Sequence, residues 1–409
     1  MTTLLIDAGP VGFRLGLTDA DGRVVRLHHE FPGRAEARLG ALYRAKVHAN
    51  EPRLGGIFCR LDERGTQGFL AVKGRPPRVG DTPLVSVRRE AIGDKAAQLV
   101  ADPALRLPGA TVRQRDGAMT VGPGPLGEGD AARALALAER TYAEGPVGPV
   151  EAGPPLLRAV MPWLDPGIEG VRVTEPDAAA VLRGCLEPLG LDVALYDAGA
   201  VRAPLDAAED EALARVTALP GGGRMVVDEA EALTAIDVDT TGRDARSVKG
   251  AQEAVAAALL SVLGRQAALR GIGGQIVLDL PRRAFASPKV LRDRLTKALA
   301  PIGRVSVPAV TNEGVVVVIA PRAAPSLLER LCELDGAGVR PGLRLRSDVV
   351  AARACRALEA ALTADRSARV TLACPGRARR YVDEAAPALA DRYGARFAVE
   401  TREGPPHVR

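Results

Sequence analysis

Aromatic residues, cysteine and lysine are all scarce in this chain of 409 residues. Only 3% of the residues are aromatic, and the five cysteines are scattered without a CxxC pair. This spacing argues against a disulfide framework and against a zinc site evident from sequence. Lysine supplies six of the 55 basic residues, so arginine, which suits bidentate phosphate contact, is the main cation. The net charge of +5 permits a polyanionic partner without requiring one.

Long hydrophobic runs are also absent, although 47% of the residues are hydrophobic. No stretch approaches the roughly 20 apolar residues that a membrane-spanning helix needs. The N-terminal segment MTTLLIDAGP carries an aspartate within its apolar run and lacks a basic n-region and a small-residue cleavage site, so it is not typical of a signal peptide. We therefore expect no membrane partner and a cytoplasmic location.

The length predicts two to four domains, because it exceeds what one compact core usually holds. Residues 3–27 alternate as a three-stranded β-meander with Gly-Pro and Asp-Gly turns. Residues 40–100 predict five short strands, which is typical of a small barrel. Residues 103–155 are rich in glycine and proline and predict only one helix.

From residue 156 onward the pattern becomes α/β. It predicts a long helix over 248–270, a helix from 288 with Ser287 as its cap, and a hairpin that turns at 312–314. The segment PSLLERLCEL, residues 325–334, predicts a further helix, and residues 347–409 predict a helix, strand, helix, strand tail.

Three aspartates lie at the ends of two apolar strands. Asp237 and Asp239 are two positions apart in TAIDVD, so both project from one face of the strand. Asp279 ends the strand IVLD, and the intervening helix predicts a crossover that makes the two strands neighbours. Three clustered carboxylates repel one another unless a cation lies among them, and magnesium fits. The alternative is that all three acids serve turns at strand ends.

Four segments resemble, in order and spacing, the catalytic half of the ribonuclease E/G family: GGRMVVDEAEALTAIDVDT, GRQAALRGIGGQIVLDL, VTNEGVVVVIA and PSLLERLCE. That family is bacterial endoribonucleases that cut single-stranded, AU-rich RNA with magnesium and leave a 5′-phosphate. The resemblance implies that Asp237 and Asp279 bind Mg2+, with Asp239 beside them where the family usually has asparagine. It also implies single-stranded RNA as the partner, in rRNA processing or mRNA decay. Arg282 and Arg283 follow as phosphate contacts or as a solvated pair.

The segment YRAKVHANEPRLGGIFCRLDERGTQGFLAVK is similar to the S1-type barrel that the family inserts into its first subdomain. By this resemblance Phe58 and Phe69 stack on RNA bases, and Arg89 and Lys95 flank the cut site. The alternatives are that both phenylalanines belong to the barrel core and that both basic residues are merely solvated.

Two features of the family are altered. In GAMTVGPG only Thr120 remains of the Arg-Thr pair that recognises an RNA 5′-monophosphate, with Met119 in the arginine position. The family's CPxCxGxG zinc link is replaced by LCELDGAGVRPG, in which Cys332 has no partner cysteine. We therefore expect no structural zinc, and any homodimer would form without that link.

The resemblance implies an α/β multidomain protein: an RNase H-like scaffold with an inserted S1/OB barrel, a mixed-sheet DNase I-like catalytic subdomain and a small α/β C-terminal domain. The implied boundaries are 1–36 and 145–217 for the scaffold, 37–100 for the barrel, 101–144 for a degenerate 5′-end-sensing region, 218–330 for the catalytic subdomain, 331–346 for a linker and 347–409 for the C-terminal domain.

Two other functions fit parts of the sequence. A catalytically weakened relative would bind RNA without cutting it, as Asp239 and Met119 suggest. The hairpin LLIDAGPVGFRLGLTDADG also resembles the phosphate-binding hairpin of actin-fold kinases, but no second phosphate loop follows.

Overall fold

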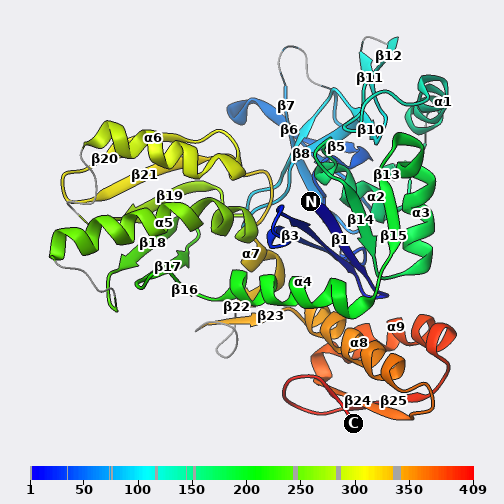
Figure 1. Cartoon of the computed structure of the whole chain (residues 1–409). Coiled ribbons are helices and arrows are strands. Elements are labelled where there is room, and N and C mark those ends of the chain that lie inside the picture. The colour runs from blue at the N-terminus through cyan, green and yellow to red at the C-terminus, as the bar shows by residue number, and fades with distance from the viewer. Residues whose placement is uncertain are drawn as a thin grey trace.

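The chain is a mixed α/β protein in a computed structural model that describes residues 2–34, 36–72, 74, 77–115, 118–143, 145–150, 153–242, 247–281, 287–334 and 342–409. Nine α-helices and six β-sheets lie within these ranges (Figure 1). None of the helices in the described ranges combines the length and apolar character needed to cross a membrane.

A five-stranded sheet begins the fold, in the order β15-β14-β1-β2-β3. Its elements are β1 (Thr3–Ala8), β2 (Phe13–Thr18), β3 (Val24–Glu30), β14 (Gly170–Val173) and β15 (Asp192–Leu195), with the helices α2 (Pro155–Val160), α3 (Pro176–Leu186) and α4 (Ala198–Leu213). The three strands predicted over residues 3–27 are confirmed as β1 to β3. One face of the sheet packs on α2 and α3, and the other packs on α4 and on C-terminal helices.

A seven-stranded sheet follows, in the order β13-β4-β8-β9-β7-β6-β5. Its strands are β4 (Leu42–Arg44), β5 (Lys46–Glu51), β6 (Gly56–Arg60), β7 (Gln67–Ala71), β8 (Leu84–Arg89), β9 (Ala97–Val100) and β13 (Gly148–Val150). Only Ala45 separates β4 from β5, although β4 pairs with β8 and β5 pairs with β6. The sheet therefore curls so that distant strands of its order meet at Ala45. The prediction of five strands and a small barrel over residues 40–100 is wrong in both respects, because six strands lie there and the described edge strands β13 and β5 do not pair to close the sheet.

A three-stranded sheet was not predicted. It consists of β10 (Ala104–Leu107), β11 (Ala110–Arg115) and β12 (Ala118–Gly122), and the predicted helix α1 (Ala131–Tyr142) packs against it. The buried Tyr142 hydroxyl donates to the Val112 carbonyl at 3.0 Å and accepts from the Leu105 N–H at 2.9 Å. One side chain thus ties the helix to two strands whose sequence signal is weak.

A six-stranded sheet has the order β16-β17-β18-β19-β21-β20. Its elements are β16 (Val216–Ala218), β17 (Arg224–Glu229), β18 (Thr234–Asp239), β19 (Gly274–Asp279), β20 (Ser306–Val310) and β21 (Val315–Ala320), with α5 (Val248–Arg270) and α6 (Pro288–Ala298). The predicted helix 248–270 is confirmed, and it ends at Gly271 in the left-handed region. The Ser287 side chain caps α6 as predicted. One hydrophobic cluster joins α5 and α6 to a single face of this sheet.

The C-terminal end of α5 is fastened to α4. Glu211 accepts from Arg265 at 2.5 and 2.8 Å and from Gln266 at 2.5 Å. Arg270 is fully buried and donates to the carbonyls of Ala212 and Ala214, each at 2.9 Å. This buried arginine thus ties the C-terminal end of α5 to the end of α4.

The last part of the chain consists of α7 (Leu327–Leu331), β22 (Cys332–Leu334), β23 (Leu343–Leu345), α8 (Ser347–Ala364), β24 (Val370–Cys374), α9 (Gly376–Tyr393), β25 (Phe397–Thr401) and β26 (His407–Val408). The 3-10 helices are η1 (Pro52–Leu54), η2 (Met161–Trp163), η3 (Glu187–Leu189) and η4 (Ala300–Ile302). The prediction of a helix over 325–334 is wrong at its end, because Cys332–Leu334 pairs with β23 as a strand. The predicted helix, strand, helix, strand order of the tail is confirmed, and an additional short strand, β26, follows and pairs with β24.

Buried charges fasten α8 to the five-stranded sheet. Arg14 donates to Asp7 at 2.9 Å and to Glu209 at 3.3 Å. Arg202 donates to Asp7 at 2.8 Å and also reaches Glu359 of α8. Burial alone would raise the pKa of Asp7, but Arg202 and Arg14 outweigh it and lower that pKa. The C-terminal helices are therefore held by interlocking ion pairs as well as by apolar contact (Figure 1).

Candidate functional site

Asp237 and Asp279 are directly paired in register on the parallel strands β18 and β19. The adjacent residues Ile236 and Leu278 are buried beneath α5 and α6. Because side chains alternate along a strand, both aspartates project from the opposite face, which is exposed. Neighbouring strands lie about 4.8 Å apart, so the two carboxylates stand side by side.

The carboxylates of this pair have few protein partners. Asp237 accepts a hydrogen bond from the Val238 N–H at 2.8 Å. Within the part of the chain that the structure describes, no hydrogen bond or ion pair engages the carboxylate of Asp279. Like charges directly opposite one another on neighbouring strands are destabilising. A cation between the two carboxylates would remove that repulsion.

Magnesium suits this donor set. It takes one or two protein carboxylates and fills its remaining positions with water and phosphate oxygens. Among the described residues no three His, Cys, Asp or Glu side chains gather as a metal cage. Asp237 and Asp279 thus offer two neighbouring carboxylates that could hold a hydrated divalent ion.

Asp239 is on the same strand face as Asp237 but is already engaged. Its carboxylate accepts from the Thr241 hydroxyl at 2.6 Å, from the Thr241 N–H at 2.9 Å and from Arg224 at 2.9 Å. These Thr241 hydrogen bonds, and then Arg224, lower the pKa of Asp239. The turn interpretation thus describes what Asp239 does in this structure, while its part in catalysis stays a prediction.

The hairpin between β20 and β21 brings its turn to the same end of the sheet. Asp279 is in register with Val315, and the Leu280 N–H donates to the Gly314 carbonyl at 3.1 Å. The predicted turn at 312–314 is confirmed, and it places exposed Asn312 and Glu313 at the end of the sheet where Asp279 lies. The sequence identified this turn but not its position at the site. Arg282 and Arg283 lie outside the described residues.

Phe58 and Phe69 form an aromatic pair on the outer side of the seven-stranded sheet. They are in register on β6 and β7, with ring centroids 5.3 Å apart and planes at 60°. Both rings are half-buried, whereas the flanking Ile57 and Cys59 point inward and are fully buried. Neither phenylalanine belongs to the hydrophobic core of this sheet, so the alternative that assigned them to the core is wrong. A side chain at Gly56 would collide with the Phe69 ring, since a Cβ there would lie 2.5 Å from its tip.

Three polar residues on the same outer side were not identified from the sequence. Lys46 is in register with Arg60, and both are exposed beside the aromatic pair. His48 lies with its ring 6.3 Å from that of Phe58. The sequence did hold a signal for them, because side chains two positions apart on a strand lie on the same face. Arg60 is two positions from Phe58, and Lys46 and His48 are two positions apart on the neighbouring strand. Positive charge and aromatic surface thus meet on one face.

The other predicted RNA contacts lie on separate elements. Arg89 ends β8, and its buried Nε has no hydrogen-bond partner among the described residues. Lys95 is exposed in the turn between β8 and β9. Thr120 is exposed on β12, in register with Arg113 of β11. The structure therefore does not gather these three side chains into one site.

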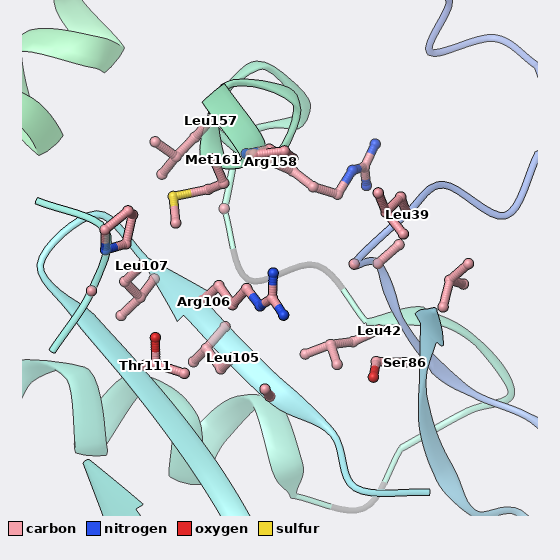
Figure 2. A pocket seen from close by; sticks show the side chains of 18 of the residues that line it. Leu39, Leu42, Ser86, Leu105, Arg106, Leu107, Thr111, Leu157, Arg158 and Met161 are labelled. Carbon is pink, nitrogen blue, oxygen red and sulfur yellow. The ribbon is translucent and has the colours of Figure 1, made fainter. Parts of the chain in front are cut away.

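A cavity of about 890 Å³ lies between the β10–β11 hairpin, the strands β4 and β8, and α2 (Figure 2). Figure 2 shows the Arg106 side chain extending across its middle, Arg158 entering from the helix, and Leu42 and Leu105 on its walls. Arg113 also lines this cavity, whereas Thr120 does not. The cavity thus combines apolar walls with cationic side chains contributed by different elements.

Comparison with known proteins gives two findings. The model of the family described as "Ribonuclease E/G family" matches residues 192–316, the range that contains the aspartate pair. Ribonuclease E of Haemophilus influenzae is 30% identical over 127 residues, which is 29% of this chain and 13% of that protein. Ribonuclease E of Buchnera aphidicola subsp. Schizaphis graminum is 35% identical over 92 residues, which is 21% of this chain and 9% of that protein. The chain therefore spans a small fraction of the length of these relatives.

Proposed function

The chain belongs to the ribonuclease E/G family through residues 192–316, and from this premise we propose that it is a magnesium-dependent endoribonuclease that cleaves single-stranded RNA. The observation that carries the proposal is the register of Asp237 with Asp279 on one exposed face. The proposed products carry a 5′-phosphate, and the proposed roles are rRNA processing or mRNA decay in the cytoplasm.

In the proposed reaction Asp237 and Asp279 hold Mg2+ at the open face of the sheet. When bound, the ion supplies Lewis-acid stabilisation of the phosphate and lowers the pKa of water near it. The Val238 N–H orients Asp237, and the exposed Asp279 leaves its side of the site open to the substrate. Asp239 acts as a positioning residue, because Thr241 and Arg224 already occupy its carboxylate.

We further propose that this curled, open seven-stranded sheet corresponds to the family's S1-type module, that the five-stranded sheet is the RNase H-like scaffold, and that the seven-stranded sheet holds the RNA. Phe58 and Phe69 offer half-buried ring faces for base stacking, which tolerates any sequence. Lys46 and Arg60 stand beside them for phosphate contact, with Arg89 and Lys95 farther along the sheet. The six-stranded lobe is then the DNase I-like catalytic subdomain of the proposed boundaries.

Metal-dependent cleavage tests this function. The purified chain should cut a labelled single-stranded RNA with magnesium and not with EDTA, and Asp279→Asn should lose at least 100-fold in rate. Asp192→Asn serves as the control, since Asp192 is an exposed strand aspartate that pairs with Arg172 in the five-stranded sheet. Matched substrates with a 5′-monophosphate or a 5′-hydroxyl, cut at equal rates, would agree with Met119 in place of an arginine. Equal rates for Asp279→Asn and the parent would refute the proposal.

A second candidate is the weakened relative that binds RNA without cutting it. The observation that favours it is the ion pair between Asp239 and Arg224, which engages a carboxylate of this face at the position where the family usually has asparagine. RNA retardation in a gel that EDTA does not change, with no product in magnesium or manganese, would establish this candidate instead.

A further inference from the structure

A small pocket lies where three parts of the fold meet. Its volume is about 220 Å³. Its walls come from β3, the segment before β4, the residue after β8, α2, η2, the end of α5, the loop after β21 and α7. Neither aspartate of the pair lines it, and it adjoins the larger cavity of Figure 2, with which it shares Leu39, Arg158 and Pro162. Nothing in the proposed cleavage reaction uses it.

Arginines outnumber carboxylates in this lining. Five arginines and two glutamates line the pocket, with no aspartate or lysine. Glu30 and Glu90 are buried and hold their arginine partners tightly: Arg330 reaches Glu90 at 2.8 Å, and Arg38 reaches Glu30 at 3.2 Å. Burial would raise the pKa of Glu30, but His28 and Arg38 outweigh it and lower that pKa to about 2. Both glutamates are therefore already committed to ion pairs. Just outside the lining, Glu36 pairs with Arg38 and Glu329 pairs with Arg322 at 2.5 Å.

Several arginine N–H groups at the pocket lack partners. Arg38 and Arg330 have side chains only 7% and 4% exposed, yet one terminal nitrogen of each has no hydrogen-bond partner among the described residues. The Arg330 nitrogen lies 3.9 Å from a Glu36 carboxylate oxygen, which is an ion pair but is too long for a hydrogen bond. The Nε of Arg322, which also lines the pocket, is likewise buried and unpartnered there. Buried donors are nearly always satisfied in native proteins, so these donors indicate a bound acceptor.

Arg26 adds a charge that no carboxylate neutralises within the described ranges. Its guanidinium lies 4.4 Å from the centre of the Trp163 ring, and burial lowers its pKa. The contact with the ring stabilises the cation only partly. A water molecule would satisfy the free donors of Arg38 and Arg330 but would leave the charge of Arg26 unbalanced, whereas an anion would do both.

We propose that this pocket binds a phosphate group through Arg26, Arg38 and Arg330. The three side chains approach from β3, the segment before β4 and α7, and a tetrahedral oxyanion presents acceptors in all of these directions. The volume is below the roughly 300 Å³ at which pockets for larger ligands begin, so the occupant is a phosphate with its water or the phosphate of a small ester. Bound there, the phosphate would link the five-stranded sheet, through Arg26 of β3, to the segment before β4 and to α7.

The test is calorimetric titration of the full-length chain with inorganic phosphate in EDTA, against chloride at equal ionic strength. Chelation removes magnesium, so the aspartate pair does not contribute. We expect saturable phosphate binding and a rise in melting temperature that chloride does not give. Arg26→Gln should weaken phosphate binding at least tenfold, and Arg26→Lys should restore part of it. Arg172→Gln is the matched control, since Arg172 lies 5.4 Å from the Tyr196 ring, away from this pocket.

Competition identifies the source of the phosphate. An RNA oligonucleotide with 5′- and 3′-hydroxyl ends that abolishes the phosphate signal would show that a strand phosphate enters the pocket. Independent binding of the two would assign the pocket to a free phosphate compound. Phosphate that is no more effective than chloride, or an Arg26→Gln chain that responds like the parent, would overturn the proposal. These results are independent of whether the chain cleaves RNA.

Discussion

Replacing Asp237 or Asp279 by asparagine should stabilise the metal-free chain, against the usual direction of a site mutation. The carboxylates project side by side from strands about 4.8 Å apart. Two unit charges about 5 Å apart in water repel by about 0.8 kcal/mol, and cross-strand pairs typically contribute roughly 0.2–1 kcal/mol. Because this face is exposed, the value for water applies. Either single substitution should therefore stabilise the metal-free lobe by about 0.5–1 kcal/mol.

A double-mutant cycle sharpens this prediction. Each single substitution removes the same repulsion, so the chain with both substitutions should gain no more than either single variant. The Coulomb argument requires this coupling to be about as large as one single effect. Additive gains would show that the two carboxylates do not sense each other.

The assay is thermal unfolding in EDTA and in saturating magnesium. In EDTA each single variant should melt about 1–4 °C above the parent, from the usual relation between stability and melting temperature. In magnesium the order should reverse, because the parent gains about 2.7 kcal/mol at 100 times the dissociation constant and the variants gain much less. Variants that melt below the parent in EDTA, or that gain as much from magnesium, would refute a shared metal site.

Three further predictions concern other parts of the chain. Phe58→Ala or Phe69→Ala should weaken single-stranded RNA binding in a gel-shift assay by roughly 1–3 kcal/mol per lost stack, with unchanged circular dichroism; unchanged affinity would contradict the stacking role. Asp239→Asn should keep metal-dependent cleavage within tenfold, because the charge it removes is already paired; loss of cleavage would make Asp239 a metal ligand. Burial lowers the pKa of His29 from 6.5 to about 4. The unfolded chain therefore takes up a proton on this histidine before the folded chain does, and the free energy of unfolding falls by roughly 3 kcal/mol as the pH drops from 6.5 to 4. The urea midpoint of unfolding should differ less between pH 7 and pH 4.5 in His29→Gln than in the parent. Part of the difference should remain, because the pKa of His28 is lowered as well. A difference as large as that of the parent would argue against His29 as the cause.

Local patterns predicted the elements around the candidate site well. The Ser287 cap, the turn at 312–314 and the long helix over 248–270 depend on nearby residues, and all three are present. The neighbouring positions of Asp237 and Asp279 followed from one crossover rule, since a helix between two strands brings parallel strands together.

Features that depend on distant residues escaped prediction. Helix α4 went unassigned, and it contains Pro204, which argues against a helix interior even though Asp197 caps its start. The strand Cys332–Leu334 exists because β23 pairs with it across a gap in sequence. Arg224 donates to Asp239 from the preceding strand, 15 residues earlier in the sequence. A pattern within a few residues of Asp239 could therefore not predict this ion pair. The phosphate pocket likewise gathers arginines that lie up to about 300 residues apart.

The position of the aspartate pair within continuous strands has a consequence for how its geometry is kept. Strand side chains alternate, so a slip of β19 by one residue against β18 would turn Leu278 outward and bury a carboxylate under α5. The backbone hydrogen bonds between β18 and β19 thus set the relative position of the two carboxylates. Substitutions far from either aspartate that weaken this strand pairing would therefore separate the two carboxylates, although both aspartates remain in the sequence.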